Sequence, residues 1–241
     1  MGLLRFIIDW KSENIKNMVL EQKVKRVTDI FAMILEAKTY TDLEKIEARD
    51  EFDKFRINED KFPKLDLNID ADKLKKLITK GVFRNDFSSN YKISPNIMSE
   101  LTTPLEQFLF AMAWKNGDLL KLKHIIKGFS DASNSINETE SAFVFYHFGR
   151  HLANPDVEPI IDQHILRAFM VYKINENDII SDKFNKILKF TTIGKKEKEL
   201  IKEYKEWLVS DELSEVAKIE DYGYYIDRIL FALGKSIKLK K

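Results

Sequence analysis

Residues 141–149 read SAFVFYHFG, and residues 159–170 read PIIDQHILRAFM. In the first stretch, apolar residues recur at helical spacing up to Gly149, and glycine often terminates a helix. In the second stretch, Asp162 stands immediately before an apolar periodic run, which is where an N-cap belongs. These patterns predict two amphipathic helices joined by a short link, and they indicate a helical fold.

Helix signals continue upstream. Residues 103–106 (TPLE) predict a capping box with proline at the first helical position, and Gly117 is a natural end for that helix. A second helix is expected from Asp118 to Gly128. Residues 137–140 (NETE) indicate another capping box, which would open the helix of the first stretch.

The flanks extend the same pattern, so the predicted class is mostly α, with a small strand contribution allowed near the N-terminus. Residues 56–103 are more broken. Further helices are expected near residues 13–37, 41–55, 195–209 and 222–233, the last ending at Gly234. The predicted organisation is one compact two-lobed unit over residues 1–241, with a core at 103–170 and a flanking lobe from 1–102 and 171–241.

Composition excludes several classes of protein. The chain has 241 residues and no cysteine, which excludes a disulfide scaffold, a Cys-ligated metal and a thiol nucleophile. Lys and Arg total 40 against 39 Asp and Glu, and this balance argues weakly against a nucleic-acid binder. Residues 103–170 hold six basic and eight acidic residues, so any basic footprint must come from a few placed residues or from the Lys-rich rear and tail.

Membrane and metal sites are not expected either. The longest apolar stretches are about ten residues, against the roughly 20 that a bilayer requires, so we expect a soluble cytoplasmic protein. His147 and His151 are four residues apart, but no glutamate lies between them, and the predicted helix end at Gly149 separates them. We therefore expect no metal site.

In combination, these stretches resemble the helix-hairpin-helix DNA glycosylase superfamily, and most closely the bacterial proteins with the 8-oxoguanine glycosylase fold. Members have an apolar helix ending in glycine, a short link, and a pattern like Pro-(apolar)-Val-Asp-x-His-(apolar)-x-Arg, which residues 159–167 approximate. Residues 104–112 look like the family's helix before its DNA-wedging loop, here residues 114–118, and residues 225–235 resemble the family's tails.

This resemblance implies a two-lobed helical fold with a divergent hairpin, because residues 132–137 lack the family's glycines. It also implies a partner, double-stranded DNA with a damaged base, and no cofactor or obligate protein partner. In this family the residue at Asp162 is the catalytic carboxylate, which stabilises positive charge on the sugar and orients the attacking water. Taken alone, an aspartate before an apolar helix indicates an ordinary N-cap, and it is the flanking motif that favours the catalytic role for Asp162.

The chain differs from the family at the position that carries the lysine for strand cleavage. Members that cleave the backbone have a lysine where this chain has Glu138, and a carboxylate cannot form a Schiff base. The resemblance therefore implies either a monofunctional glycosylase or a protein that has lost activity, unless Lys127 or another nearby lysine supplies the amine from a remodelled loop. Glu138 can also simply complement a helix dipole.

The remaining site residues are also carried over from the resemblance. The expected DNA contacts are Lys115, Asn116, Ser135, Asn137, His164 and Arg167. The candidates for the flipped-base pocket are Trp114, Phe145, Tyr225 and Phe231. Each has an alternative interpretation: Asn116 as part of an Asn-Gly turn, Arg167 as an ion-pair partner, and the aromatic residues as core.

The predicted function is hydrolysis of the N-glycosidic bond of a damaged base, an oxidised purine such as 8-oxoguanine, in base-excision repair. One alternative is a non-catalytic DNA- or nucleoside-binding module on the same fold. Another is a helical protein-interaction domain. Fold does not determine function, so all three stay open at this point.

Overall fold

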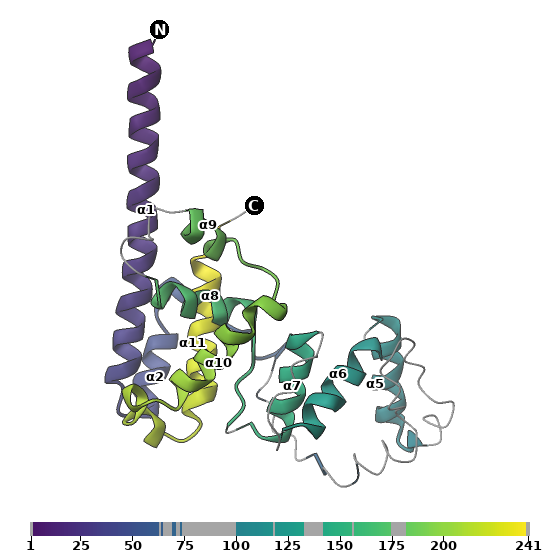
Figure 1. The fold of residues 1–241 in the computed structure, drawn as a ribbon. Helices are drawn as coiled ribbons and strands as arrows, with labels where there is room; N and C mark the ends of the chain where they lie inside the picture. Colours follow the sequence, from purple (N-terminus) through teal and green to yellow (C-terminus); the bar gives the residue numbers. More distant parts are fainter. Residues whose placement is uncertain are drawn as a thin grey trace. The chain divides into compact units, whose positions relative to one another are not determined.

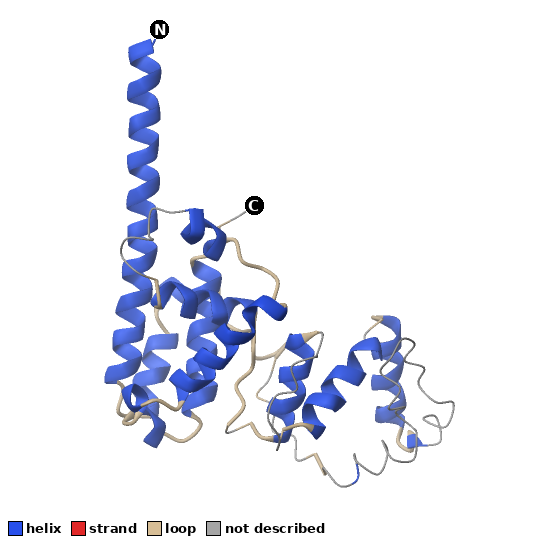
Figure 2. Ribbon diagram, in the orientation of Figure 1, coloured by secondary structure: helices blue, strands red, loops and turns tan. Residues whose placement is uncertain are grey.

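The computed structural model describes residues 2–62, 64, 69–70, 73, 100–117, 119–132, 142–155, 157–174 and 182–239. Their regular elements are all helical, and Figure 2 draws no strand among them, which confirms the mostly α class. The chain divides into two compact units, Met1–Pro63 with Ile161–Lys241 (unit 1) and Lys64–Ile160 (unit 2). The boundary falls inside residues 103–170, so the predicted core segment is shared between the two units.

Unit 1 is built around a short central helix, α8 (Gln163–Tyr172). Its partners in the packing are α1 (Gly2–Glu36), α9 (Asp182–Leu188), α10 (Lys198–Leu208) and α11 (Tyr222–Ser236), while α2 (Tyr40–Glu47) packs on α1 and α11 (Figure 1). Short 3-10 turns lie at Asp50–Phe52, Lys195–Glu197, Asp211–Leu213 and Val216–Lys218. Aromatic side chains fill the centre: Phe31 stacks on Tyr172 with ring centroids 4.0 Å apart, and Trp207 lies 5.2 Å from Phe31.

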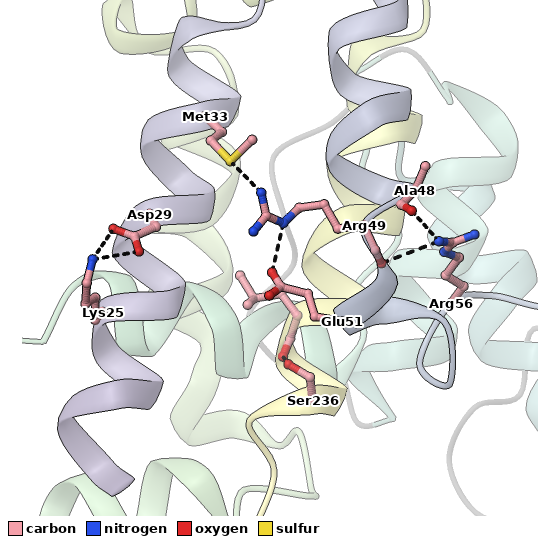
Figure 3. A network of polar contacts seen from close by, with 9 residues as sticks. Lys25, Asp29, Met33, Ala48, Arg49, Glu51, Arg56 and Ser236 are labelled. Atoms are coloured by element: carbon pink, nitrogen blue, oxygen red, sulfur yellow. Dashed lines mark hydrogen bonds and ion pairs between the residues drawn. The ribbon is translucent and has the colours of Figure 1, made fainter. Parts of the chain in front are cut away.

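Two arginines, Arg49 and Arg56, hold the segment after α2 in place by hydrogen bonds within unit 1 (Figure 3). The Arg49 Nε donates to the Glu51 carboxylate at 3.0 Å, and its Nη1 lies 3.6 Å from the Met33 sulfur on α1. Arg56 donates to the Ala48 carbonyl at 2.6 Å. These contacts fix the chain against α1 and the end of α2 shortly before it leaves unit 1.

Unit 2 contains α5 (Pro104–Lys115), α6 (Leu119–Ser130) and α7 (Phe143–Ala153). The predicted capping box at the start of α5 is confirmed: Thr103 Oγ1 accepts from the Glu106 backbone N–H at 3.2 Å, and the Glu106 carboxylate accepts from the Thr103 N–H at 2.8 Å. The predicted end is also confirmed, because Gly117 has φ of +72° directly after the C-cap Asn116. Both signals are local, and both hold.

Three other glycines were predicted as helix ends, and all three predictions are wrong. Gly128, Gly149 and Gly234 lie inside α6, α7 and α11, where each lets two helices approach closely. A Cβ on Gly149 would lie 1.9 Å from the Ile125 carbonyl oxygen, and one on Gly128 would lie 1.8 Å from that of Tyr146. The α6–α7 crossing is therefore a backbone-to-backbone contact that any side chain at either position would disrupt.

Candidate active site at the amino end of α8

Asp162 is the N-cap of α8, as the sequence predicted. Its backbone is extended, with φ −129° and ψ 152°, and its carboxylate accepts a hydrogen bond from the His164 backbone N–H at 2.6 Å. The residue is partly buried but keeps exposed surface. A cap of this kind holds the carboxylate in one orientation while leaving lone pairs available to a ligand.

The helix crossing between α8 and α11 places Gly234 against this cap. A Cβ on Gly234 would lie 1.8 Å from the His164 carbonyl oxygen, so only glycine allows the two backbones to meet here. The end of α11 thus lies directly beside the first turn of α8. The Phe231 ring, one turn earlier on α11, meets the His164 ring edge-on with centroids 5.0 Å apart.

His164 is held as a neutral imidazole. Burial lowers its pKa to about 4, Asp162 opposes that shift, and the positive charges of Arg167, Lys238 and Lys235 reinforce it. The His164 Nδ1 lies 2.7 Å from Arg167 Nη1, which always donates. Nδ1 is therefore the acceptor, and the ring proton sits on Nε2.

Arg167 has no exposed surface, which corrects the expectation that it contacts the DNA backbone. Its Nη1 donates to the Gly234 carbonyl at 2.7 Å, and its Nη2 donates to the Phe190 carbonyl. Burial lowers the pKa of Arg167 to about 10, against the opposing field of Asp162, so the guanidinium stays charged at neutral pH. The side chain links α8 by hydrogen bonds to α11 and to the segment after α9, and it does not face solvent.

The base-pocket candidates of unit 1 fall in two places. Phe231 lies beside His164, so the structure gathers Asp162, His164, Arg167 and Phe231 at one end of α8. Tyr225 lies six residues before Phe231 on α11, about 9 Å along the helix. Its ring is 5.7 Å from that of Tyr40, in an aromatic cluster between α2 and α11.

The wedge candidates lie at the carboxyl end of α5 in unit 2. Trp114 is 68% exposed, which excludes the core interpretation for this residue. Lys115 and Asn116 are exposed as well. Phe145 on α7 is half-buried, with the Lys121 Nζ 5.0 Å from the centre of its ring.

Lys127 does not present a free amine. Its Nζ lies 2.6 Å from the Asp131 carboxylate and 5.5 Å from the centre of the Tyr146 ring. An ammonium held in this way has no lone pair for attack on a sugar. Glu138, Ser135 and Asn137 lie outside the described residues, and the proposed hairpin contacts stay predictions.

Sequence reasoning missed the buried ion pair of unit 2. Arg150 on α7 donates through Nε and Nη2 to one oxygen of Glu158, at 2.8 and 2.6 Å, and through Nη1 to the Asp131 carbonyl at 2.7 Å. Burial and the Glu158 carboxylate act in opposite directions on the pKa of Arg150, and the net result is a raised value. No local pattern marks this pair, because a proline-containing turn separates its members.

The backbone of Glu158 also contacts the side chain of His151. The His151 Nδ1 lies 2.7 Å from the Glu158 carbonyl oxygen, so this nitrogen is engaged with the backbone. Throughout the described ranges, no three His, Asp or Glu side chains gather as metal ligands would.

Comparison with protein families, with curated proteins and with solved structures finds no match to this chain. Within the described part, no helix has the length and apolar character needed to cross a membrane. Any assignment of function therefore rests on the geometry of the described residues.

Proposed function

We propose that this protein is a DNA glycosylase-like hydrolase, in which Asp162 acts on the N-glycosidic bond of a damaged purine. The observation that carries this proposal is the position of Asp162, a partly exposed carboxylate fixed as the cap of α8. The resemblance requires a carboxylate that caps and catalyses at once. Beside it lies the buried guanidinium of Arg167, which forms no hydrogen bond to any carboxylate in the described ranges.

The proposed chemistry is a hydrolysis. As the bond between base and sugar breaks, positive charge develops on the sugar, and the Asp162 carboxylate stabilises it at close range. Water adds to the sugar carbon as the bond to the base breaks, and its proton passes to the Asp162 carboxylate. The departing base takes up a proton from solvent, and Asp162 then returns its proton to solvent, so that one water is consumed. The neutral His164 stays outside this proton transfer, because its Nδ1 accepts from Arg167.

The reaction is proposed to stop at base release. A Schiff base requires an unprotonated amine near the sugar, and Lys127 is engaged with Asp131. The test is to incubate the protein with duplexes that contain 8-oxoguanine, uracil or a methylated purine. Alkali should be needed to reveal the abasic sites, and borohydride should trap no protein–DNA adduct. Strand scission without alkali would contradict the monofunctional assignment, and tight binding without any release would favour a non-catalytic binding module.

A second candidate, a protein-interaction domain, is favoured by α5. The helix buries none of its residues, and its apolar face is exposed, with Leu105 at 65% and Phe108 at 60%. Apolar side chains that are exposed together on one helix face commonly mark interaction sites. Phe108→Glu should abolish capture of a partner without unfolding the protein, whereas Val209→Glu, at a position 70% exposed in unit 1, should not. Equal effects of the two changes would argue against this second function.

A further inference from the structure

Unit 1 contains a group of lysines without acidic partners. Some exposed lysines of this unit pair with carboxylates, for example Lys25 with Asp29 at 3.0 Å and Lys173 with Glu203 at 2.6 Å. Among the lysines that form no ion pair within the described part of the chain, four lie on α9, at the end of α11 and just after these helices. Two of them are exposed and two are half-buried, and we refer to the four as the lysine rim: Lys186, Lys189, Lys235 and Lys238. Four cations in one region, with no ion-pair partner among the described residues, indicate an anionic partner.

The rim lysines are close together because the elements that carry them are joined. The Leu239 backbone N–H donates to the Leu188 carbonyl at 3.1 Å. Lys238 directly precedes Leu239 and Lys189 directly follows Leu188, so this hydrogen bond brings the two lysines close together along the backbone. Lys186 lies less than one turn before Leu188 on α9. The Lys235 Nζ lies 5.4 Å from the centre of the Phe231 ring, which itself meets His164.

The same lysines border the candidate active site. Lys235 and Lys238 both lower the pKa of His164, which shows that their charges lie close to the first turn of α8. Arg167 joins the Phe190 carbonyl, next to Lys189, to Gly234, next to Lys235. The rim and Asp162 therefore belong to one end of unit 1.

Positive charge is unevenly distributed along the chain, although the net charge is near zero. Residues 183–196 and 229–239 together carry seven lysines and no acidic residue, although the whole chain is balanced at +1. The nearest acidic residues along the chain are Asp182, which begins α9, Glu197 and Asp227, and the Asp227 carboxylate accepts a hydrogen bond from the Tyr204 hydroxyl at 2.7 Å. Positive charge is thus concentrated where the proposed reaction requires a polyanion.

We propose that the lysine rim binds the phosphate backbone of DNA and holds the duplex beside Asp162. The choice of DNA over other polyanions rests on the proposed function, whereas the binding surface itself rests on the four unpaired lysines. Flexible ammonium groups suit this role, because they contact phosphates as point charges without reading sequence. The rim would supply affinity, and Asp162 would supply chemistry.

The experiment compares two fourfold variants with equal net charge. The rim variant is Lys186→Gln/Lys189→Gln/Lys235→Gln/Lys238→Gln, and the control replaces four paired, exposed lysines of the same unit: Lys25, Lys173, Lys202 and Lys218. Binding of a short fluorescein-labelled duplex is followed by anisotropy across a salt series. The rim variant should lose at least about tenfold in affinity at low salt and flatten the plot of log K against log salt by about 3, while the control stays within about twofold of wild type.

Each outcome decides a separate point. Equal losses in the two variants, or no loss in the rim variant, would overturn the rim. So would binding of phosphatidylserine vesicles with the same rim dependence as DNA, because the partner would then be a lipid surface. Rim-dependent DNA binding without any base release would retain the rim and reject the glycosylase function. Base release by a protein whose DNA affinity is unchanged in the rim variant would retain the glycosylase function and reject the rim.

Discussion

Two buried arginines, Arg150 in α7 of unit 2 and Arg167 in α8 of unit 1, both tie a helix to backbone carbonyls. Arg150 also faces a buried carboxylate, Glu158, which neutralises it directly. Arg167 faces two carbonyls and a neutral imidazole and bonds to no carboxylate within the described residues, although the charge of the capping Asp162 favours its charged form. The first arrangement is complete in itself, whereas the second leaves a carboxylate with exposed surface, which is the reason for placing function there.

The largest expected effect comes from breaking the complete pair. Arg150→Met would leave the buried Glu158 without its cation, and we expect the free energy of unfolding to fall by about 3–5 kcal/mol. Removing both charges in Arg150→Met/Glu158→Leu should restore at least half of that loss. Urea denaturation of the single and double variants measures both values. A double variant no more stable than the single one would show that the carbonyl contacts, and not the ion pair, dominate.

The corresponding change in unit 1 should cost less. Arg167→Met would deprive the Gly234 and Phe190 carbonyls of their donor but leave no buried carboxylate uncompensated, so we expect a loss of about 1–3 kcal/mol. Arg167→Lys should recover little, because an ammonium cannot match the planar fork. The measurement is the same denaturation series. A loss equal to that of Arg150→Met would remove the distinction between the two arginines.

His164 should make unit 1 sensitive to acid. Its folded pKa of about 4 lies below the ordinary value of 6.5, so the unfolded chain binds more protons between these limits and stability falls as the pH drops from 6.5 toward 4. Because the ring is only partly buried, we expect a loss of about 1–2 kcal/mol. His164→Gln should flatten this dependence when wild type and variant are unfolded at pH 7 and pH 4.5. Parallel pH profiles would mean that other groups carry the effect.

The smallest effect concerns the cap itself. Asp162→Ala should lower stability by about 1 kcal/mol, because the His164 backbone N–H loses its acceptor. Asp162→Asn should be nearly neutral, since asparagine caps about as well as aspartate. Thermal unfolding of the two variants distinguishes them. A large loss with Asn would indicate that the charge of Asp162, through Arg167, is a structural requirement.

The two arginines also show what the sequence could and could not predict. The caps at Thr103 and Asp162 were predicted correctly, because a cap involves only residues a few positions apart. Gly117 was predicted correctly for the same reason. The local signal for Arg167 named the residue but not its environment, since its partners lie 23 and 67 residues away.

The glycines also show that contacts distant in sequence can override a local signal. Gly128, Gly149 and Gly234 carry the sequence signature of a helix end, yet their role is set by a second helix that crosses them. The lysine rim is likewise a tertiary feature, because it combines α9 with the end of α11. Not every local signal held: the capping box predicted at residues 137–140 does not open α7, which begins at Phe143 with Ala142 as its N-cap. The caps at Thr103 and Asp162 were predictable from neighbouring residues, and the contacts between helices were not.

The most direct test of the proposed function is base release by wild type and Asp162→Asn on a duplex that contains 8-oxoguanine, with alkali added to reveal abasic sites. Asparagine preserves the cap, so the variant should keep the stability and DNA affinity of wild type. We predict that wild type releases the base and that the rate in the variant falls by at least about a hundredfold, the loss typical of removing a catalytic acid–base group. Equal rates in the two proteins, or no release from any damaged duplex by wild type, would contradict the proposal.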